Sequence, residues 1–385
     1  MRLSRRPLAT VLVALVTAGA LAACDDHASG HDAASTPTWH PSTLPVPDGS
    51  RAAVRDAVFC GDRWYVVGGT VAADGSTAPA LWSSADARTW QDVPIAAQDS
   101  YARESVLYTV GCREGRVAAV GAKTGGAHGN PRSSSWYLRP DGTLVDVIAP
   151  FTLYAGADAL SVSRIVGGSP GWIIAGSRRT GAAVWTSPDA TSFTLRDAVP
   201  QLVSPPGGET TALDAVGDAA GWTVVGRGET RTQNAPVPLA WTSADGVAWQ
   251  RQPVPAGTDG FADLERVTST RNGLVAAGIR GDGFATWSRA GSTWSAGTVF
   301  GHATEGGTAP FVSGIAAAGS GLYVAVSDGT RFDLWDHTDG HWRKAAIPID
   351  LQSNGDSQLT VAAYGGTVLL LSDDGRSGHV WTTAG

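Results

Sequence analysis

Seven tryptophans recur along this chain at nearly equal steps, and no other feature of the sequence constrains the fold as strongly. The steps between them are 54, 49, 56, 46, 48 and 46 residues. Repeats of about 20–50 residues indicate solenoids, propellers or arrays, because each unit can bury its apolar faces only against its neighbours. The seven residues are Trp82, Trp136, Trp185, Trp241, Trp287, Trp335 and Trp381.

Each repeat contains four short segments with the composition of β-strands. Apolar runs rich in Val, Ile, Ala and Trp alternate with Gly, Asp and Ser turns, and the other eight tryptophans also fall on the repeat. Beyond the extreme N-terminus, no window has the apolar period of a long helix. Four strands at a period near 50 are typical of a β-propeller blade, whereas parallel β-helix repeats are about half as long. The sequence therefore predicts an all-β, seven-bladed propeller.

The two ends of the chain are expected to share one blade. The last repeat stops after its third strand, near Trp381, and lacks a fourth. Residues 38–47 carry the pattern of the missing strand, with Thr38-Trp39 followed by Pro45-Val46-Pro47. Proline is tolerated there because an outermost strand has a free edge. We expect residues 38–385 to form one closed propeller domain, its ring closed by the N-terminal strand joining the last blade.

The first 23 residues have the features of a signal peptide. Arg2, Arg5 and Arg6 precede an apolar run that is too short to span a membrane. The following Leu21-Ala22-Ala23-Cys24 resembles the lipobox of bacterial lipoproteins, which implies acylation of Cys24, as by palmitate, and a lipid anchor on the outer membrane face. Ordinary secretory cleavage is the alternative, and both Sec and twin-arginine export remain open. Residues 24–37 are polar and predict a flexible tether.

Two further cysteines, Cys60 and Cys112, end the first strands of neighbouring repeats. Outside the cytoplasm such a pair can form a disulfide, and two buried free thiols are the alternative. The formal net charge of −7 disfavours nucleic acid as a partner. The chain has no Gly-rich phosphate loop and no metal-ligand spacing, so we predict neither a cofactor nor a metal.

Short Asp turns follow the third strand of several repeats. Ser84-Ala85-Asp86 and Ser243-Ala244-Asp245-Gly246 are clear cases, in which the carboxylate can accept backbone N–H groups. The turns resemble the Asp-box repeats of sialidase-like propellers, from about residue 38 to the end of the chain. In those families the box is structural and lies opposite the ligand site. The chain departs from sialidases by having seven repeats, where they have six, and by lacking their Arg-Ile/Val-Pro motif.

The long loops of the repeats carry arginine. They join the second strand to the third, and in a propeller they share one face with the crossings between blades, which is the usual ligand face. One interpretation is a polar rim that receives a protein, peptide or glycan; the other is a solvated surface of mutually neutralised charges. The arginines are Arg178, Arg231, Arg280, Arg331 and Arg376.

The first strands carry a second set of polar residues. Aligning them on Val58, Val110, Val166, Val216 and Val267 places one polar residue two positions earlier in each. Because the innermost strand lines the central channel, these groups are expected to meet at its mouth, either as a ligand site or as the lining of a water-filled channel. They are Asp56, Tyr108, Arg164, Asp214 and Glu265, with Gly314 and Thr360 completing the ring.

These features favour a monomeric, non-catalytic binding or scaffold protein at the outer face of the cell envelope. The alternative hypothesis is a glycoside hydrolase or lyase that uses the channel carboxylates. A shared fold cannot decide between them, because function depends on the site. We therefore assign no catalytic residue from the sequence.

Overall fold

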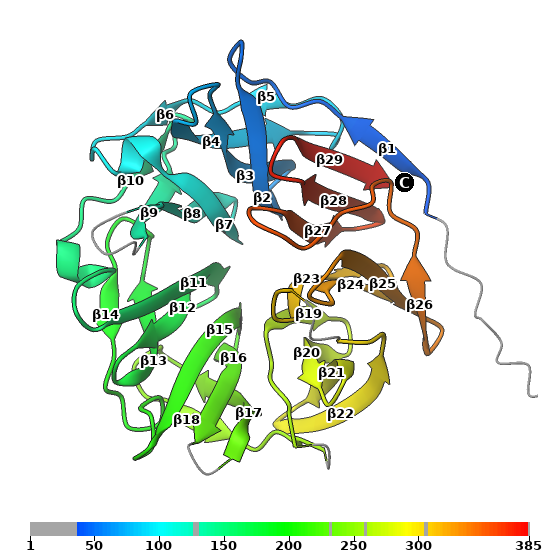
Figure 1. Cartoon of the computed structure of the whole chain (residues 1–385). Coiled ribbons are helices and arrows are strands. Elements are labelled where there is room, and N and C mark those ends of the chain that lie inside the picture. The colour runs from blue at the N-terminus through cyan, green and yellow to red at the C-terminus, as the bar shows by residue number, and fades with distance from the viewer. Residues whose placement is uncertain (1–36, 126–130, 231–232, 258–259, 304–306, 384–385) are drawn as a thin grey trace, which may run out of the picture. The chain divides into compact units, whose positions relative to one another are not determined.

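The computed structural model describes residues 37–125, 131–230, 233–257, 260–303 and 307–383. Within them, seven antiparallel sheets are arranged as the blades of a ring (Figure 1). The predicted seven-bladed propeller is confirmed. Helix among the described residues includes the short 3-10 turns η1 (Ala102–Glu104) and η3 (Phe151–Leu153). No helix in these parts of the chain has the length and apolar character that a membrane crossing requires.

Each blade has four strands, ordered from the channel outward. The innermost strands are β2 (Arg51–Cys60), β7 (Val106–Arg113), β11 (Ala159–Gly168), β15 (Gly208–Asp218), β19 (Arg266–Thr270), β23 (Phe311–Ala318) and β27 (Gln358–Tyr364). The second strands are β3 (Arg63–Val71), β8 (Arg116–Lys123), β12 (Gly171–Arg178), β16 (Gly221–Thr230), β20 (Gly273–Arg280), β24 (Gly321–Ser327) and β28 (Thr367–Asp373).

The third strands carry the periodic tryptophans, and the fourth strands form the outer edge of the ring. The third strands are β4 (Thr77–Ser84), β9 (Arg132–Leu138), β13 (Gly181–Ser187), β17 (Gln233–Ser243), β21 (Gly283–Ala290), β25 (Phe332–Thr338) and β29 (Gly378–Thr383). The fourth are β5 (Gln91–Asp92), β10 (Leu144–Asp146), β14 (Thr194–Arg196), β18 (Gln250–Gln252), β22 (Thr293–Phe300), β26 (His341–Ala345) and β1 (Trp39–Ser42). In blade two, β6 (Ile95–Ala96) adds a fifth strand, parallel to β10.

The N-terminal strand β1 completes blade seven, as predicted. It pairs antiparallel with β29 from Trp39 opposite Thr383 to Ser42 opposite Val380, and Figure 1 shows this blue strand beside the red one. The strand is shorter than the predicted segment 38–47. The rest of that segment leads into blade one: Leu44 lies in the core between blades seven and one, and Pro45 accepts the indole N–H of Trp82. The segment therefore connects the last blade to the first.

The periodic tryptophans pack between blades and hold the crossing segments. Trp185, Trp241 and Trp287 are fully buried. A buried indole N–H needs an acceptor, and in each case it donates to a carbonyl of the segment that leads into the same blade, at 2.7, 2.8 and 2.8 Å. Trp82 makes the same bond to the carbonyl of Pro45 at 2.7 Å. These bonds explain the tryptophan in four blades, whereas Trp136 and Trp381 donate to the hydroxyls of Ser134 and Ser372 in their own blades.

The Asp turns after the third strands are structural. Asp86 Oδ1 accepts the backbone N–H groups of Arg88 and Thr89 at 2.9 and 2.8 Å. Asp245 Oδ1 does the same for Val247 and Ala248, at 2.8 and 3.0 Å. These backbone bonds hold the pKa of both carboxyls below the usual range. The aspartates therefore close the turn between the third and fourth strands.

Candidate functional site

One residue of each innermost strand takes the same position in the ring. In each blade, one residue of the second strand pairs with the periodic tryptophan on one side and with a residue of the innermost strand on the other. The shared position is the residue just before that innermost-strand residue. In blade one, Val66 pairs with Trp82 and with Ala57, so the position is that of Asp56. In blade three, Ile174 pairs with Trp185 and with Ile165, so the position is that of Arg164. The seven positions are Asp56, Thr109, Arg164, Asp214, Arg266, Gly314 and Thr360.

The predicted set was correct for Asp56, Arg164 and Asp214, and wrong by one residue in blades two and five. There Thr109 and Arg266 take the shared position, whereas Tyr108 and Glu265 precede it. The alignment failed because valine follows the shared position directly in these blades, but two residues later at Val58, Val166 and Val216. A shift of one residue turns a side chain to the other face of a strand.

The displaced residues Tyr108 and Glu265 contact the neighbouring blade. The hydroxyl of Tyr108 donates to the carbonyl of Val162 at 2.7 Å, and its ring packs in the core between blades two and three. Burial raises the pKa of this phenol. Glu265 Oε2 accepts the backbone N–H of Val312 in blade six. Neither side chain is free for a ligand at the predicted position.

The channel carboxylates link consecutive blades through backbone hydrogen bonds. Asp56 Oδ2 accepts the N–H of Val110 in blade two at 3.0 Å, and its Oδ1 accepts that of Ala57 at 3.0 Å. Asp214 repeats the pattern with Val267 of blade five at 3.0 Å and Ala215 at 2.8 Å. Innermost strands of neighbouring blades belong to different sheets and share no backbone pairing, so these side chains supply hydrogen bonds between them.

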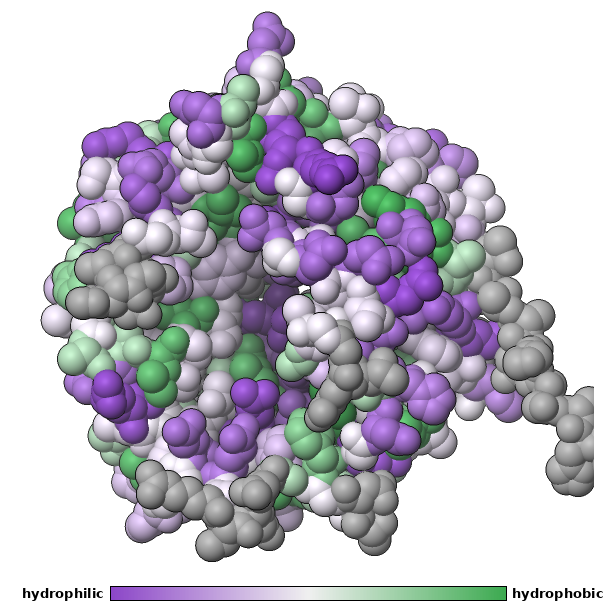
Figure 2. All heavy atoms as spheres, viewed as in Figure 1, coloured by the Kyte–Doolittle hydropathy of each residue, from purple (hydrophilic) through white to green (hydrophobic). Residues whose placement is uncertain are grey.

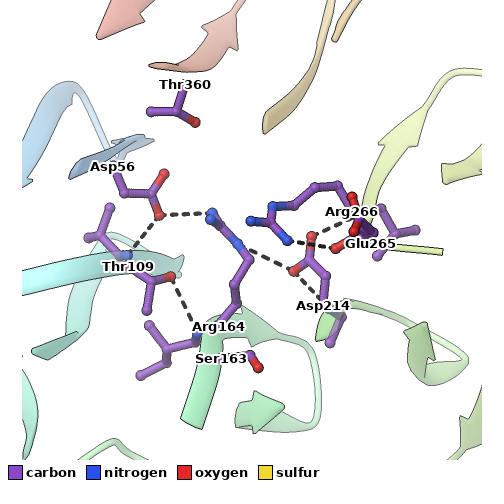
Figure 3. Close-up of polar contacts among 12 residues, drawn as sticks. Asp56, Thr109, Ser163, Arg164, Asp214, Glu265, Arg266 and Thr360 are labelled. Carbon is purple, nitrogen blue, oxygen red and sulfur yellow. Dashed lines mark hydrogen bonds and ion pairs between the residues drawn. The ribbon is translucent and has the colours of Figure 1, made fainter. Parts of the chain in front are cut away.

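Arg164 lies between the two aspartates, and Arg266 lies beside it (Figure 3). Arg164 Nη2 is 2.8 Å from Asp56 Oδ2, and its Nε is 3.4 Å from Asp214 Oδ1. Arg266 donates instead to two backbone carbonyls, from Nε to Ser313 at 3.2 Å and from Nη1 to Glu265 at 2.7 Å. Hereafter the charged tier denotes Asp56, Arg164, Asp214 and Arg266.

Burial controls the charges of this region. It raises the pKa of Asp214 despite the nearby Arg164 and Arg266. It also raises the pKa of Glu265 to about 8, with a further contribution from the carboxylate of Asp263. The pKa of Arg266 is lowered, first by burial and then by repulsion from Arg164. Asp263 was not predicted from the sequence; it is 1% exposed and accepts the N–H of Ile279 at 2.9 Å.

A cavity of about 320 Å³ occupies the channel next to the charged tier. Arg164, Asp214 and Arg266 line its base. Its wall continues along the innermost strands toward the short turns that join first and second strands, as far as Cys112, Gly167 and Gly217. The expectation of a ligand face on the long-loop side did not foresee this cavity. Figure 2 shows a face of the molecule that is hollowed at its centre, with hydrophilic residues at depth.

The expectation of long loops between second and third strands was wrong in several blades: only two residues separate Arg178 from Gly181 and Arg280 from Gly283, and the long segments on this face are the crossings between blades. The rim arginines that the structure describes are engaged with neighbouring groups or lie exposed on the surface. Arg178 is buried, with Nε 3.8 Å from Asp197, and Arg331 pairs with Asp350 at 2.6 Å on the surface. Arg280 ends β20 with a backbone bridge to Ala262, and Arg376 is exposed. Arg231 lies outside the described residues. These placements support a solvated, largely neutralised surface more than a concentrated anion site.

Cys60 and Cys112 form a disulfide between the ends of β2 and β7. Their Sγ atoms are 2.08 Å apart and their Cα atoms 5.4 Å apart. The bond joins blades one and two on the side of the short turns. Cys24, the predicted lipidation site, lies outside the described residues. In the described part of the chain, no three His, Cys, Asp or Glu residues gather as a metal site would require.

No protein-family model matches this sequence, and no curated protein matches it. Among solved structures, a polysaccharide lyase described as an ulvan lyase is similar over 88% of this chain and 95% of its own, with 12% identity and a TM-score of 0.51. The extracellular domain of a putative one-component system from B. thetaiotaomicron matches 89% of this chain but only 39% of its own, at 11% identity and a TM-score of 0.51.

A sialidase from Trypanosoma rangeli is also similar, over 90% of this chain and 60% of its own, with 12% identity and a TM-score of 0.42. The two likenesses with a TM-score of 0.51 show the propeller fold and nothing beyond it. They assign no activity to this chain, because function depends on the residues of the site.

Proposed function

We propose that this protein is a non-catalytic binding protein, anchored by lipid at the outer face of the cell envelope. The observation that carries the proposal is how the channel carboxylates are used. Both oxygens of Asp56 and of Asp214 accept backbone N–H groups, and Arg164 contacts both residues. A general acid or base must be able to exchange its proton with a substrate. Carboxylates held in this way serve instead to join the blades.

The remaining carboxyls near the channel are poorly placed for sugar chemistry. Glycosidases use a pair of carboxyl groups that flank the substrate. Asp263 is almost fully buried, and Glu265 is turned to the backbone of β23. The long-loop face, with its mixed charges, suits a protein, peptide or glycan that binds through many weak contacts. This supports binding over hydrolysis or elimination.

Activity and binding can be separated with the full chain purified in detergent. We expect that the protein releases no sugar or unsaturated product from a panel of envelope and algal polysaccharides. We also expect that a peptide array or a glycan array retains the protein. Product formation by the wild type that disappears in both Asp214→Asn and Glu265→Gln, with circular dichroism unchanged, would show an enzyme. A protein that is retained on neither array would contradict the binding role.

The anchor is tested by cell fractionation of Cys24→Ala. Acylation requires the thiol of this residue, so the variant should move from the membrane fraction to the soluble fraction, whereas Cys60→Ala should stay with the membrane. Retention of Cys24→Ala in the membrane would remove the lipid anchor from the proposal.

A further inference from the structure

The geometry points to a carboxylate-binding site in the channel cavity, formed by Arg164 and Arg266 and closed around a small aliphatic body. This inference goes beyond the proposed function, because it adds a site in the channel, apart from the long-loop face. It places the ligand between the innermost strands, on the short-turn side of the charged tier. Neither the rim arginines nor the long loops take part.

Arg266 is a partly buried cation that forms no ion pair within the described part of the chain. A guanidinium taken out of water is normally paired with a carboxylate, because an unpaired buried charge is costly. Arg164 has Asp56 and Asp214 as partners, whereas no described carboxylate lies within ion-pair distance of Arg266, which is held by two carbonyls. Its nearest acidic neighbour in the chain, Glu265, has a pKa raised to about 8 and is therefore largely uncharged at neutral pH. Arg266 thus has no direct ion-pair partner at the base of the cavity, although the carboxylates of Asp214 and Asp56 lie near enough to favour its charge.

Both guanidinium groups keep N–H donors that are not used within the charged tier. Arg164 uses Nε and Nη2 toward the aspartates, and Arg266 uses Nε and Nη1 toward the carbonyls. Within the described part of the chain, Arg164 Nη1 and Arg266 Nη2 donate no hydrogen bond. Figure 3 shows the two guanidinium groups side by side, and both residues line the cavity. Two adjacent guanidinium donors match the two oxygens of a carboxylate.

The wall of the cavity above the two arginines includes small apolar side chains. The next channel-facing positions along the innermost strands include Val58, Val166 and Val216, together with Gly111 and Thr268, and all of them line the cavity. Val58, Val166 and Val216 offer apolar contacts to an aliphatic group, while Thr268, Ser269 and backbone groups make the rest of the wall polar. The volume of about 320 Å³ accommodates a group the size of one aliphatic residue. The ligand class is therefore a carboxylate on a small branched or linear aliphatic body.

Two sources supply such a group: a free short-chain acid, and the C-terminal residue of a peptide. The test is calorimetry on the full chain in detergent at pH 7. One arm uses 3-methylbutanoate against 3-methylbutanamide, and the other uses the peptide Gly-Gly-Val against its C-terminal amide. We expect at least one acid to bind and its amide to bind at least about tenfold more weakly, since a charge-assisted bond is lost. Binding in only one arm identifies the source.

Variants separate the two parts of the site. Arg266→Gln should weaken binding of the acid at least about tenfold, because Arg266 is the guanidinium that has no direct ion pair of its own. Val166→Phe fills the cavity without touching the charged tier and should abolish binding. Arg331→Gln, which removes an exposed arginine paired with Asp350, is the matched control and should leave binding unchanged.

Several results would overturn the inference: equal binding of acid and amide, no binding in either arm, or an equal loss in Arg331→Gln and Arg266→Gln. If the acids do not bind while the arrays retain a ligand, this site is wrong and the proposed binding role stands. If a polysaccharide is cleaved while the acids bind as expected, the carboxylate site stands and the non-catalytic role is wrong.

Discussion

At the scale of single residues, the distance in sequence to the periodic tryptophan predicts the channel-facing residue of a blade better than alignment on the valines does. Arg164, Arg266, Gly314 and Thr360 each lie 21 residues before the periodic tryptophan of their blade. This spacing follows from two antiparallel hairpins with short loops, and it would have identified Arg266 in place of Glu265. The bonding of these side chains could not be predicted, because their partners are backbone N–H groups of the next blade.

The buried carboxyl of Glu265 should make stability depend on pH. Its pKa is raised to about 8 in the fold from an ordinary value of 4.5, so between these values the folded chain holds a proton that the unfolded chain has lost. The free energy of unfolding should therefore fall as pH rises through this window, by about 1 kcal/mol or more between pH 6 and 8. Urea unfolding at several pH values measures it.

Glu265→Gln is the matched variant, because a glutamine resembles the protonated acid and still accepts from Val312. It should lose the decline between pH 6 and 8, while the smaller contribution of Asp263, whose pKa is raised to about 6, stays below that range. Parallel curves for wild type and variant would show that Glu265 is not the titrating group.

At the scale of elements, the sequence predicted which strands exist but not all of their limits. The closing strand was foreseen because the last repeat lacks a fourth strand and residues 38–47 carry its pattern. Its end at Ser42 was not, because the tertiary contacts of Leu44 and Pro45 in blade one decide it. The parallel strand β6 was missed because two residues carry no periodicity.

Deleting Trp39–Ser42 tests the closure of the ring. The deletion exposes the edge of β29 and removes the bond from Trp39 Nε1 to the carbonyl of Ala346, which measures 2.8 Å. We expect a loss of about 3 kcal/mol in the free energy of unfolding, as for the removal of a packed aromatic side chain. Deleting residues 28–31 of the predicted tether is the control. Equal thermal unfolding of the two deletions would refute the closure.

Replacing Cys60 and Cys112 together by serine tests the link between blades one and two. The bond spans 52 residues of sequence. Removing such a crosslink frees the unfolded chain and should cost about 2–4 kcal/mol of stability. Thermal unfolding of the wild type should also shift downward with reductant, whereas the double variant should not respond. Intact mass spectrometry that finds two free thiols in the unreduced wild type would contradict the disulfide.

At the scale of the whole molecule, the channel combines a polar network with an apolar cavity. The network was foreseen in outline, since polar residues recur on innermost strands that must line an axis. The side on which the cavity opens was not foreseen, because it depends on the contacts that Arg164 and Arg266 make with other blades. Within this network, the channel carboxylates hold neighbouring blades together.

The most direct test is the free energy of unfolding of Asp214→Ala, measured in urea against wild type. The variant strips the backbone N–H groups of Ala215 and Val267 of their acceptor and removes one partner of Arg164, so we predict a loss of about 3 kcal/mol. The control is Glu209→Ala, an exposed residue of the same strand, which should change stability by about 0.5 kcal/mol or less. An Asp214→Ala chain as stable as the control would contradict the account.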